Sequence, residues 1–526
     1  MQAVHYALAL LTGALLALSF PRFGHPAAAW IALAPLLVAI GQVARRDGGA
    51  RRAAVLGFAS GAVYFGGTVY WVAGVMATYG GLARPAAAGV AALLVGYLAL
   101  YPALFALATA ALVRAYGSPA LLLAPAVWVA TELARAHVWS GFPWVLLGYS
   151  QAFVLPVAQV ASLVGVYGLS MLVAAVGAAL AFAAVTRGRL RWVPALAAIA
   201  LVAIAGVWGA VRLREGTLRR LGTPIRVAVV QGNIDQADKW NPALREAILQ
   251  RYIDLSRRAI ARDAGLVIWP EASLPFLFER EAAPADRIRR LAREGRTSLL
   301  VGGDDVDLRT DRYYNAAFLV APDGRTAAVY RKIRLVPFGE YVPLRRLLFF
   351  VDPLVEAVSD FSPGDEMTLL PIDGHRASTA ICYEAVYPGL VDAFVDRGSE
   401  LLTTITNDAW FGRSSAAYQH FQQAALRAVE QGRYLARAAN TGISGFVDPY
   451  GRVLASTGLF ETRVLVADLR LLRGRTLYGR LGDLAAYAGA SCVVLALGVA
   501  VLGRRGPARG RWPDRARFWH NTRERS

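Results

Sequence analysis

The sequence predicts a polytopic α-helical membrane domain of about eight spans that carries a separate α/β domain. Hydrophobic residues make up 56% of the 526-residue chain, a larger share than a wholly soluble protein needs. They dominate residues 1–211, become fewer from 212 to 480, and return at 481–502. Strand and helix patterns alternate within the middle segment, which is typical of α/β layering. The length of the chain also indicates more than one domain.

Eight hydrophobic runs approach the roughly 20 residues that a helix needs to cross a bilayer. They lie at residues 5–20, 27–43, 53–76, 86–113, 119–136, 152–185, 190–211 and 481–502. The first run lacks a basic start and is followed by further runs, so we interpret it as a retained helix rather than a signal peptide. The run at 152–185 is longer than one span needs, and Gly165 is a candidate for a bend within it.

Basic residues lie in the loops beside these runs and indicate the orientation of the chain. The net charge of +19 would suit nucleic acid, but much of the excess lies in short loops and in the tail 503–526. We therefore expect a lipid bilayer and no nucleic acid as partner. With the N-terminus in the cytoplasm, alternation places the loops 45–52 and 187–191, Arg114 and the tail on the cytoplasmic side. Both termini are then cytoplasmic, and residues 212–480 lie on the outer face.

Two further loops, 77–84 and 137–151, fall on the same outer face by this alternation. The second contains an aromatic, turn-rich stretch at 139–144. One interpretation is a belt of aromatic side chains at the bilayer interface. The other is a lipid-facing floor to an active site, and the sequence alone leaves both open.

The segment 220–470 is predicted to form an α/β domain with mixed sheets. Expected strands lie at 225–230, 266–269, 298–302, 315–321, 326–331, 376–381 and 401–406, and expected helices at 242–262, 284–294, 388–396 and 415–436. Asp323-Gly324 is a strong turn signal between two of these strands, and a second hairpin is expected at 448–451. Hairpins make a sheet mixed rather than purely parallel.

Cys382 is the first candidate for chemistry. It follows an apolar strand, and the chain has only one other cysteine, Cys492. Because Cys492 lies within the last hydrophobic run, a disulfide would have to form across the membrane boundary and is set aside. A lone thiol outside the cytoplasm is a liability unless it has a task. This favours a nucleophile over the alternative, a buried structural cysteine.

Glu271 and Lys332 have similar settings and could assist the thiol. Glu271 follows Trp269-Pro270 at the end of an apolar strand, where burial would raise its pKa and suit it as a general base. Lys332 is one of only two lysines, the other being Lys239. Its charge could stabilise an oxyanion and favour the thiolate. The alternatives are a carboxylate that caps the next turn and a surface lysine on a basic strand end.

Histidine, metal and cofactor chemistry find little support in the sequence. None of the six histidines has a strand-end setting like that of Cys382, so none is predicted to be the base; they are His5, His25, His137, His375, His420 and His520. No His, Cys and Asp cluster has metal-ligand spacing, and no P-loop or dinucleotide fingerprint stands out. We therefore expect neither a metal nor a cofactor.

Six short stretches carry a resemblance to a known family. They are Gln231-Gly232-Asn233 with Lys239-Trp240, Trp269-Pro270-Glu271, Arg331-Lys332 with residues 335–343, Ile381-Cys382-Tyr383-Glu384, residues 407–412, and the loop 140–144. Together with the layout of the spans, they resemble the apolipoprotein N-acyltransferases of the nitrilase, or carbon–nitrogen hydrolase, superfamily. The resemblance covers nearly the whole chain apart from the Arg-rich tail.

This resemblance implies a nitrilase-like αββα sandwich on the periplasmic face of a bacterial inner membrane. It implies a triad of Glu271, Lys332 and Cys382 and a two-step transfer through a thioester on Cys382. The donor would be a membrane phospholipid, typically phosphatidylethanolamine. The acceptor would be the α-amine of the diacylglyceryl-cysteine at the N-terminus of an apolipoprotein. Lys332 and the Tyr383 backbone N–H would hold the oxyanion, and we expect the protein to act as a monomer.

Supporting roles follow from the same resemblance. Glu340 would assist or orient Lys332, Tyr383 and Glu384 would shape the pocket beside the nucleophile, Trp240 would lie on a loop near the lipid entrance, and Asn315 would line the pocket. Ordinary packing or capping is the alternative for each of these residues.

Two other functions fit parts of this pattern. A membrane-tethered amidase or hydrolase of the nitrilase family would use water in place of the amine. A catalytically inactive scaffold or lipid transporter would not need the triad. Both expected substrates carry acyl chains in the bilayer, whereas a hydrolase of soluble amides needs no spans, so the transferase is the function that we expect.

Overall fold

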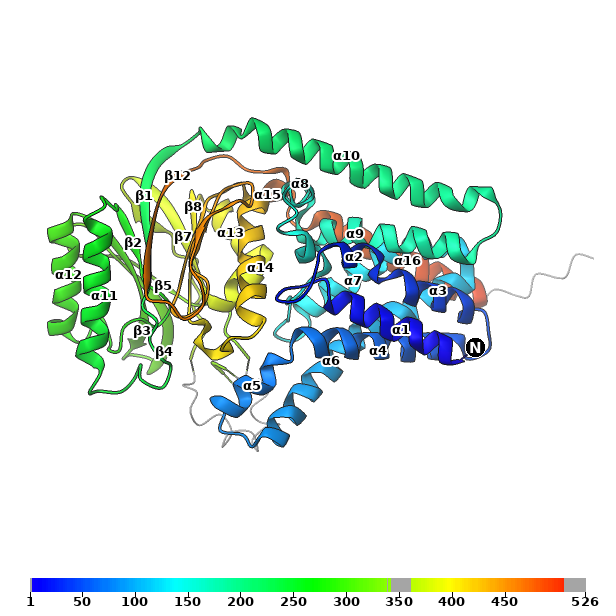
Figure 1. Ribbon diagram of the computed structural model, residues 1–526, viewed down its shortest axis with the longest axis horizontal. Helices are drawn as coiled ribbons and strands as arrows, with labels where there is room; N and C mark the ends of the chain where they lie inside the picture. Colours follow the sequence, from blue (N-terminus) through cyan, green and yellow to red (C-terminus); the bar gives the residue numbers. More distant parts are fainter. Residues whose placement is uncertain (1, 338, 342–360, 506–526) are drawn as a thin grey trace, which may run out of the picture.

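The computed structural model describes residues 2–337, 339–341 and 361–505, and shows a helical bundle beside an α/β domain (Figure 1). The bundle contains helices from residues 2–215 and 477–505, and the α/β domain contains the strands between 223 and 471. Phe338, Val342 and Pro343 of the predicted motif lie outside the described residues. So does the predicted basic tail from residue 506 onward.

Apolar helices form the bundle. They are α1 (Gln2–Ala17), α2 (Ala27–Ala32), α3 (Ala34–Val43), α4 (Gly49–Thr68), α5 (Trp71–Thr78), α6 (Arg84–Tyr116), α7 (Ala124–His137), α8 (Leu155–Ala158), α9 (Ala161–Val185), α10 (Val193–Glu215), α15 (Leu477–Leu481) and α16 (Leu484–Arg505). Small residues let them approach closely. A Cβ on Gly57 of α4 would lie only 2.3 Å from the Pro102 carbonyl oxygen of α6.

The number of membrane spans is lower by length and composition than the sequence predicts. Within the described part of the chain, five helical segments are long and apolar enough to cross a bilayer: 84–116, 118–137, 161–185, 189–219 and 484–502. A sixth is added if α4 and α5, bent by 55° at their junction, count as one span. The 16 residues of α1 rise only about 24 Å, short of the roughly 30 Å hydrocarbon core. The predicted count of about eight is therefore not confirmed.

Gly165 interrupts α9, as its sequence position suggested. Its φ of 67° and ψ of −174° are not helical, and a Cβ there would lie 2.4 Å from the Tyr478 ring. Both constraints require glycine. The break frees the backbone N–H of Val166, which donates to Glu430 Oε1 at 2.9 Å. The predicted bend in the run 152–185 is confirmed.

The α/β domain contains two six-stranded sheets. One has the order β12-β1-β2-β3-β4-β5 and the other the order β11-β10-β9-β8-β7-β6. The strands are β1 (Thr223–Gln231), β2 (Leu266–Ile268), β3 (Ser298–Asp307), β4 (Arg312–Val320), β5 (Thr326–Arg331), β6 (Leu370–Ile372), β7 (His375–Ile381), β8 (Leu401–Thr406), β9 (Leu435–Ala439), β10 (Gly445–Val447), β11 (Val453–Ser456) and β12 (Arg463–Leu471). Parallel pairs (β1–β2, β7–β8) and antiparallel pairs (β3–β4, β4–β5) occur in the same sheets, so the predicted mixed sheets are confirmed.

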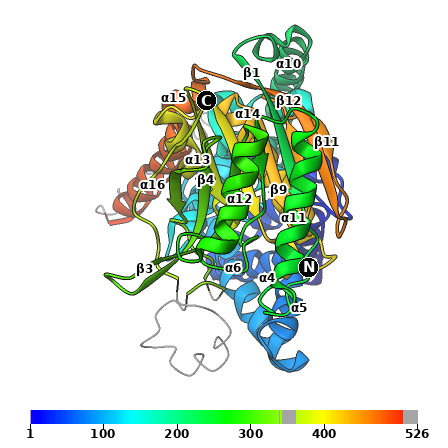
Figure 2. The same cartoon turned by 90° about the vertical axis from the view of Figure 1, so that its left-hand side faces the viewer.

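Helices cover the outer face of each sheet. The helices α11 (Arg245–Ile260) and α12 (Ala282–Gly295) lie over the first sheet, in front of its strands in Figure 2. The helices α13 (Pro388–Asp396) and α14 (Ala416–Gln431) lie over the second sheet. The inner faces of the two sheets pack on each other through residues such as Val229, Leu300 and Ile405. These are four αββα layers, and α14 is the layer beside the bundle (Figure 1).

One predicted helix is too long. The sequence pattern predicts a helix over 415–436, but α14 ends at Gln431 because Gly432 adopts φ 60°, the left-handed conformation that often terminates helices. The next residues form the buried strand β9. The strands β6 and β12 were also not predicted, and β3 runs five residues further than expected, to Asp307.

Candidate active site

Three strand ends bring Glu271, Lys332 and Cys382 together. Glu271 comes shortly after β2, Lys332 directly follows β5, and Cys382 directly follows β7. The first two strands belong to one sheet and β7 to the other. All three side chains are buried. The charges of Glu271 and Lys332 are both close enough to Cys382 to shift the pKa of its thiol.

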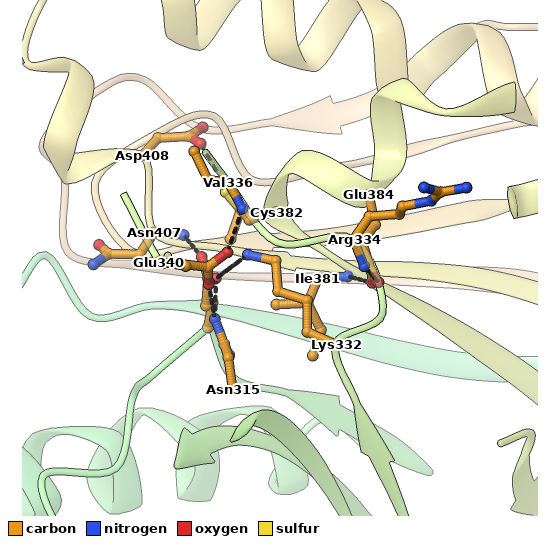
Figure 3. Close-up of polar contacts among 12 residues, drawn as sticks. Asn315, Lys332, Arg334, Val336, Glu340, Ile381, Cys382, Glu384, Asn407 and Asp408 are labelled. Carbon is orange, nitrogen blue, oxygen red and sulfur yellow. Dashed lines mark hydrogen bonds and ion pairs between the residues drawn. The ribbon is translucent and has the colours of Figure 1, made fainter. Parts of the chain in front are cut away.

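Lys332 bridges two carboxylates in this cluster. Its Nζ lies 3.1 Å from Glu271 Oε1 and 2.9 Å from Glu340 Oε1, and Figure 3 shows it beside Glu340 and Asn315. Asn315 Nδ2 donates to the same two oxygens at 2.7 and 2.8 Å. The backbone N–H of Asn407 donates to Glu271 Oε2 at 2.8 Å. Each carboxylate oxygen of Glu271 is therefore held by at least one donor.

These contacts correct one prediction about Glu271. Burial alone would raise the pKa of its carboxyl, as the sequence suggested. However, the Lys332 charge and the hydrogen bonds from Asn315 and Lys332 outweigh burial, so the pKa of Glu271 lies below its ordinary value. Burial also opposes the charge on Lys332, but the Glu271 and Glu340 carboxylates hold the pKa of Lys332 well above its ordinary value. The pair is ionised at neutral pH.

The thiol of Cys382 remains protonated in the resting site. Burial and the nearby Glu271 carboxylate raise its pKa, and the Lys332 charge only partly offsets them. The Lys332 charge favours the thiolate, as predicted, but burial and the Glu271 carboxylate outweigh it in the resting state. Cys382 also adopts φ 53°, which costs a non-glycine residue free energy and is often found at functional sites. A protonated thiol beside an ionised carboxylate suits proton transfer at the moment of attack.

Glu384 joins the two strand ends that carry Lys332 and Cys382. Its Oε2 accepts the N–H of Ile381 at 2.8 Å, and its Oε1 accepts the N–H groups of Ile333 and Arg334 at 2.7 and 3.0 Å (Figure 3). The Tyr330 hydroxyl donates to the same Oε1 at 2.8 Å. Glu384 therefore acts as a clamp, because its one side chain holds both strand ends.

Glu384→Ala is expected to lower the free energy of unfolding by about 3 kcal/mol or more, because several buried donors lose their acceptor at once. Glu384→Gln keeps one acceptor oxygen and is expected to lose about half as much. Thermal unfolding of the purified proteins in detergent measures both. An unchanged unfolding midpoint for the alanine protein would show that the clamp does not hold the two strand ends.

Tyr383 and the loop 140–144 connect the site to the bundle. The hydroxyl of Tyr383 donates to the Gly141 carbonyl at 3.2 Å, and Tyr387 donates to the Ser140 carbonyl at 3.1 Å. Trp144 Nε1 donates to Gln419 Oε1 at 2.8 Å. The loop therefore lies under the turn Cys382–Val386 that begins with the nucleophile, called the nucleophile turn below. For residues 140–144 this favours the floor of an active site over a belt of aromatic side chains at the bilayer interface.

Trp139, at the edge of the loop 137–151, is exposed, whereas Tyr79, in the loop 77–84, contacts the α/β domain. Trp139 is 78% exposed and stacks on Tyr97 at 5.2 Å, which fits an interfacial aromatic side chain. In the other loop, the Tyr79 hydroxyl donates to the Ala409 carbonyl at 3.1 Å. Both loops thus contact the α/β domain.

Trp240 and Lys239 are neighbours with opposite surroundings. Trp240 is 51% exposed, whereas the triad residues are buried. Lys239 is buried, and its Nζ lies 3.4 Å from the Glu271 carbonyl oxygen. Burial lowers the pKa of Lys239 to about 8. The rarity of lysine in the chain pointed to this residue, but no site role was predicted for it.

His420 was missed by the sequence analysis. Its Nε2 lies 3.0 Å from the Cys382 carbonyl oxygen, and its Nδ1 lies 3.0 Å from Asp408 Oδ1. The expected setting for a catalytic histidine was a strand end, whereas His420 lies inside α14, near its start. A single histidine inside a helix has no local pattern that separates a site residue from a core residue.

Two family models match the chain. The carbon-nitrogen hydrolase model matches residues 226–477, and the apolipoprotein N-acyltransferase N-terminal domain model matches residues 12–179. An apolipoprotein N-acyltransferase of Geobacter metallireducens is 43% identical over 515 residues, which cover 95% of each chain. The chain belongs to the apolipoprotein N-acyltransferase family. It is an acyltransferase enzyme, as the resemblance implied.

Other relatives of this family are similar over most of their length. The apolipoprotein N-acyltransferase of Methylococcus capsulatus is 37% identical over 487 residues, covering 90% of this chain and 92% of the relative. Among solved structures, Saccharomyces cerevisiae Nit3 of the nitrilase superfamily is 22% identical, with a TM-score of 0.38, over 47% of this chain and 90% of that one.

An apolipoprotein N-acyltransferase family member with these apolar helices is a membrane protein.

Proposed function

We propose that the protein transfers an acyl chain from a membrane phospholipid to the N-terminal α-amine of the diacylglyceryl-cysteine of apolipoproteins. Phosphatidylethanolamine is the donor to test first. The observation that carries this proposal is the position of the buried Glu271, Lys332 and Cys382 cluster directly above loop 140–144 of the bundle. Both substrates present their reacting groups at the level of the lipid headgroups, where such a site can meet them.

In the first half-reaction Cys382 becomes acylated. Glu271 takes the Sγ proton as sulfur attacks the ester carbonyl, and Lys332 with the Tyr383 backbone N–H stabilises the tetrahedral oxyanion. Collapse breaks the ester C–O bond. The leaving alkoxide takes the proton from Glu271, so that a lysophospholipid departs and a thioester remains on Cys382.

In the second half-reaction the acceptor amine attacks the thioester. Glu271 accepts the proton that the nitrogen loses, and the same donors stabilise the second oxyanion. Collapse breaks the C–S bond, the proton returns to sulfur, and an amide is formed. Burial of the cluster excludes water, which favours attack by the amine over hydrolysis. A membrane-tethered hydrolase remains the alternative that the experiment below separates.

The supporting residues take roles that fit their contacts. We infer that Glu340 orients Lys332, since the carboxylate lies 2.9 Å from Nζ. Asn315 holds both carboxylates, and Glu384 clamps the nucleophile turn. Tyr383 positions the nucleophile turn on the loop 140–144. Trp240 is exposed, so a lipid or a peptide can contact its side chain.

We further propose an orientation and a division of the chain. Residues 1–211 and 481–502 are the membrane parts, 220–470 is the catalytic domain on the periplasmic face, and both termini are cytoplasmic. Figure 1 supports this: the start of α1 and the α9–α10 turn lie at the bundle end far from the α/β domain. Cysteine-labelling of single sites in loops 45–52 and 77–84 from outside the membrane tests it. We expect labelling at 77–84 only.

Eight spans remain our proposal, with α1 and α2–α3 as the two that are short. Both lie within the bundle, because His5 contacts Gln42 at 3.0 Å and the Leu36 N–H donates to Thr12 at 2.9 Å. A bundle of this kind can carry short helices through a bilayer that thins beside them. We propose that one chain suffices, because Glu271, Lys332 and Cys382 meet within the α/β domain of the chain itself.

The test is the intact mass of the purified protein after incubation with phosphatidylethanolamine. We expect a mass increase of one acyl chain, absent in Cys382→Ser and lost on adding a diacylated lipopeptide, which gains the chain. Release of free fatty acid in place of acylated lipopeptide would establish the hydrolase. An active protein whose transfer survives Cys382→Ser would overturn the thioester mechanism.

A further inference from the structure

A buried polar cluster lies behind the nucleophile and takes no part in the reaction proposed above. It consists of Asp408, His420 and Arg437, whose side chains are all 0% exposed. Arg437 Nη2 lies 2.9 Å from Asp408 Oδ2 and 3.0 Å from His420 Nδ1. Through His420 Nε2, the cluster contacts the carbonyl oxygen of Cys382 at 3.0 Å.

The contacts of His420 determine where its proton lies. A carbonyl oxygen can only accept a hydrogen bond, so the nitrogen facing Cys382 must be the donor. The other ring nitrogen, Nδ1, lies 3.0 Å from both Arg437 Nη2, which can only donate, and Asp408 Oδ1, which accepts, so the hydrogen that the contacts fix is the one on Nε2. Burial and the Arg437 charge also lower the pKa of His420 and keep the ring neutral. His420 therefore carries a hydrogen on Nε2, aimed at a backbone carbonyl and not at the thiol.

A hydrogen bond from His420 to the Cys382 carbonyl also fixes the direction of the Tyr383 N–H. In a trans peptide unit the C=O of one residue and the N–H of the next lie in one plane and point in opposite directions. The carbonyl of Cys382 and the N–H of Tyr383 belong to the same unit. A hydrogen bond from His420 that fixes the carbonyl on one side therefore fixes the direction of the Tyr383 N–H on the other.

The nucleophile turn needs such a fixed point. Cys382 has φ 53°, a conformation that persists only where the surroundings overdetermine it. Glu384 holds the residue before it, through the N–H of Ile381 at 2.8 Å. His420 holds the peptide unit after it. His420 is itself held in place by the 16-residue helix α14, which packs on the bundle through the hydrogen bond between Gln419 and Trp144.

We propose that His420 is a positioning residue that holds the Cys382–Tyr383 peptide so that the Tyr383 N–H faces the developing oxyanion. The inference rests on the proposed acyl transfer, in which that N–H is an oxyanion donor. It assigns His420 no proton transfer with the thiol. Loss of the Nε2 donor should therefore slow attack on a carbonyl, where an oxyanion forms, and leave attack on a saturated carbon unchanged.

Two electrophiles separate these effects in the full-length protein in detergent. p-Nitrophenyl octanoate acylates Cys382 through an oxyanion, and iodoacetamide alkylates it without one. The variants are His420→Met and His420→Gln, which are alike in size and differ in that only glutamine donates. Gln423→Met is the control, because Gln423 is equally buried one turn further along α14 and does not contact Cys382.

We expect His420→Met to slow acylation about 10- to 100-fold while alkylation stays within about threefold of the unchanged protein, since a displaced oxyanion donor costs up to about 10²–10³. His420→Gln and Gln423→Met should keep both rates within about threefold. Acylation of His420→Met at the unchanged rate, or an equal fall in both rates, would overturn the proposal.

If His420→Met does not fold, His420→Gln decides alone. A preserved ratio of acylation to alkylation supports the positioning role, and a fall of about tenfold or more in that ratio overturns it. The ester reports on His420 even if phosphatidylethanolamine leaves no adduct. That last result would count against the proposed donor and not against the role of His420.

Discussion

Lys332→Met is expected to lower the rate of Cys382 acylation by about 10³-fold, because one preorganised oxyanion donor is worth about 10²–10³ and the cation has a second task. Its Nζ lies 3.1 Å from Glu271 and 2.9 Å from Glu340. Without it, two buried carboxylates face each other with no cation between them. The pKa of Glu271 then rises, and a protonated acid replaces the base. Intact mass, recorded over time with phosphatidylethanolamine, measures the rate.

The same change should destabilise the fold by about 3 kcal/mol, since a buried ion pair loses one partner. Lys332→Met combined with Glu340→Gln should recover part of this stability and none of the acylation. Lys239→Met is the matched control. It removes the other buried lysine, whose Nζ lies 3.4 Å from the Glu271 backbone carbonyl oxygen and whose charge also acts on Asp304 and the Glu271 carboxylate, and it should slow acylation less than about tenfold. Equal effects of the two lysine changes would refute the assignment of Lys332.

The parts of the site that sequence predicts are those with a local signal. Cys382, Glu271 and Lys332 each follow an apolar strand, and such strands of one α/β domain carry side chains to a common edge. The hairpin at Asp323-Gly324 is local in the same sense, and so is the bend at Gly165. For these features a few neighbouring residues determine the conformation: the structure has the hairpin and the bend, and it brings the three side chains together.

The parts that were missed depend on contacts between distant residues. The pKa of Glu271 is set by Lys332, 61 positions away, and the sequence shows only the burial that opposes it. His420 has no recognisable setting until the fold places Cys382 beside it. The end of α14 at Gly432 was overlooked because an apolar pattern continues into β9. The span count is not confirmed because α1, whose composition suits a membrane, is shorter than the length criterion requires.

Glu271→Gln is expected to lower Cys382 acylation by about 10³-fold, since a positioned general base contributes about 10²–10⁴. The amide cannot take the thiol proton. It also has one acceptor oxygen where the carboxylate has two, so it cannot satisfy both Asn315 and the Asn407 N–H, which donate to different oxygens. Glu271→Asp keeps a carboxylate at a shorter reach and should lose less. Glutamine and aspartate proteins of equal activity would contradict the role of base.

Two measurements, the pH dependence and the comparison of two electrophiles, show whether Glu271→Gln slows acylation because it removes a general base. The carboxylate is the active form, so acylation by the unchanged protein should fall only as pH drops below about 4.5, because the pKa of Glu271 is lowered. Glu271→Gln should lack this acid limb. Because the thiolate is needed for every electrophile, Glu271→Gln should slow iodoacetamide as well as the ester, whereas His420→Met should slow the ester alone. A glutamine protein that reacts with iodoacetamide at the full rate would mean that another group takes the proton from Cys382.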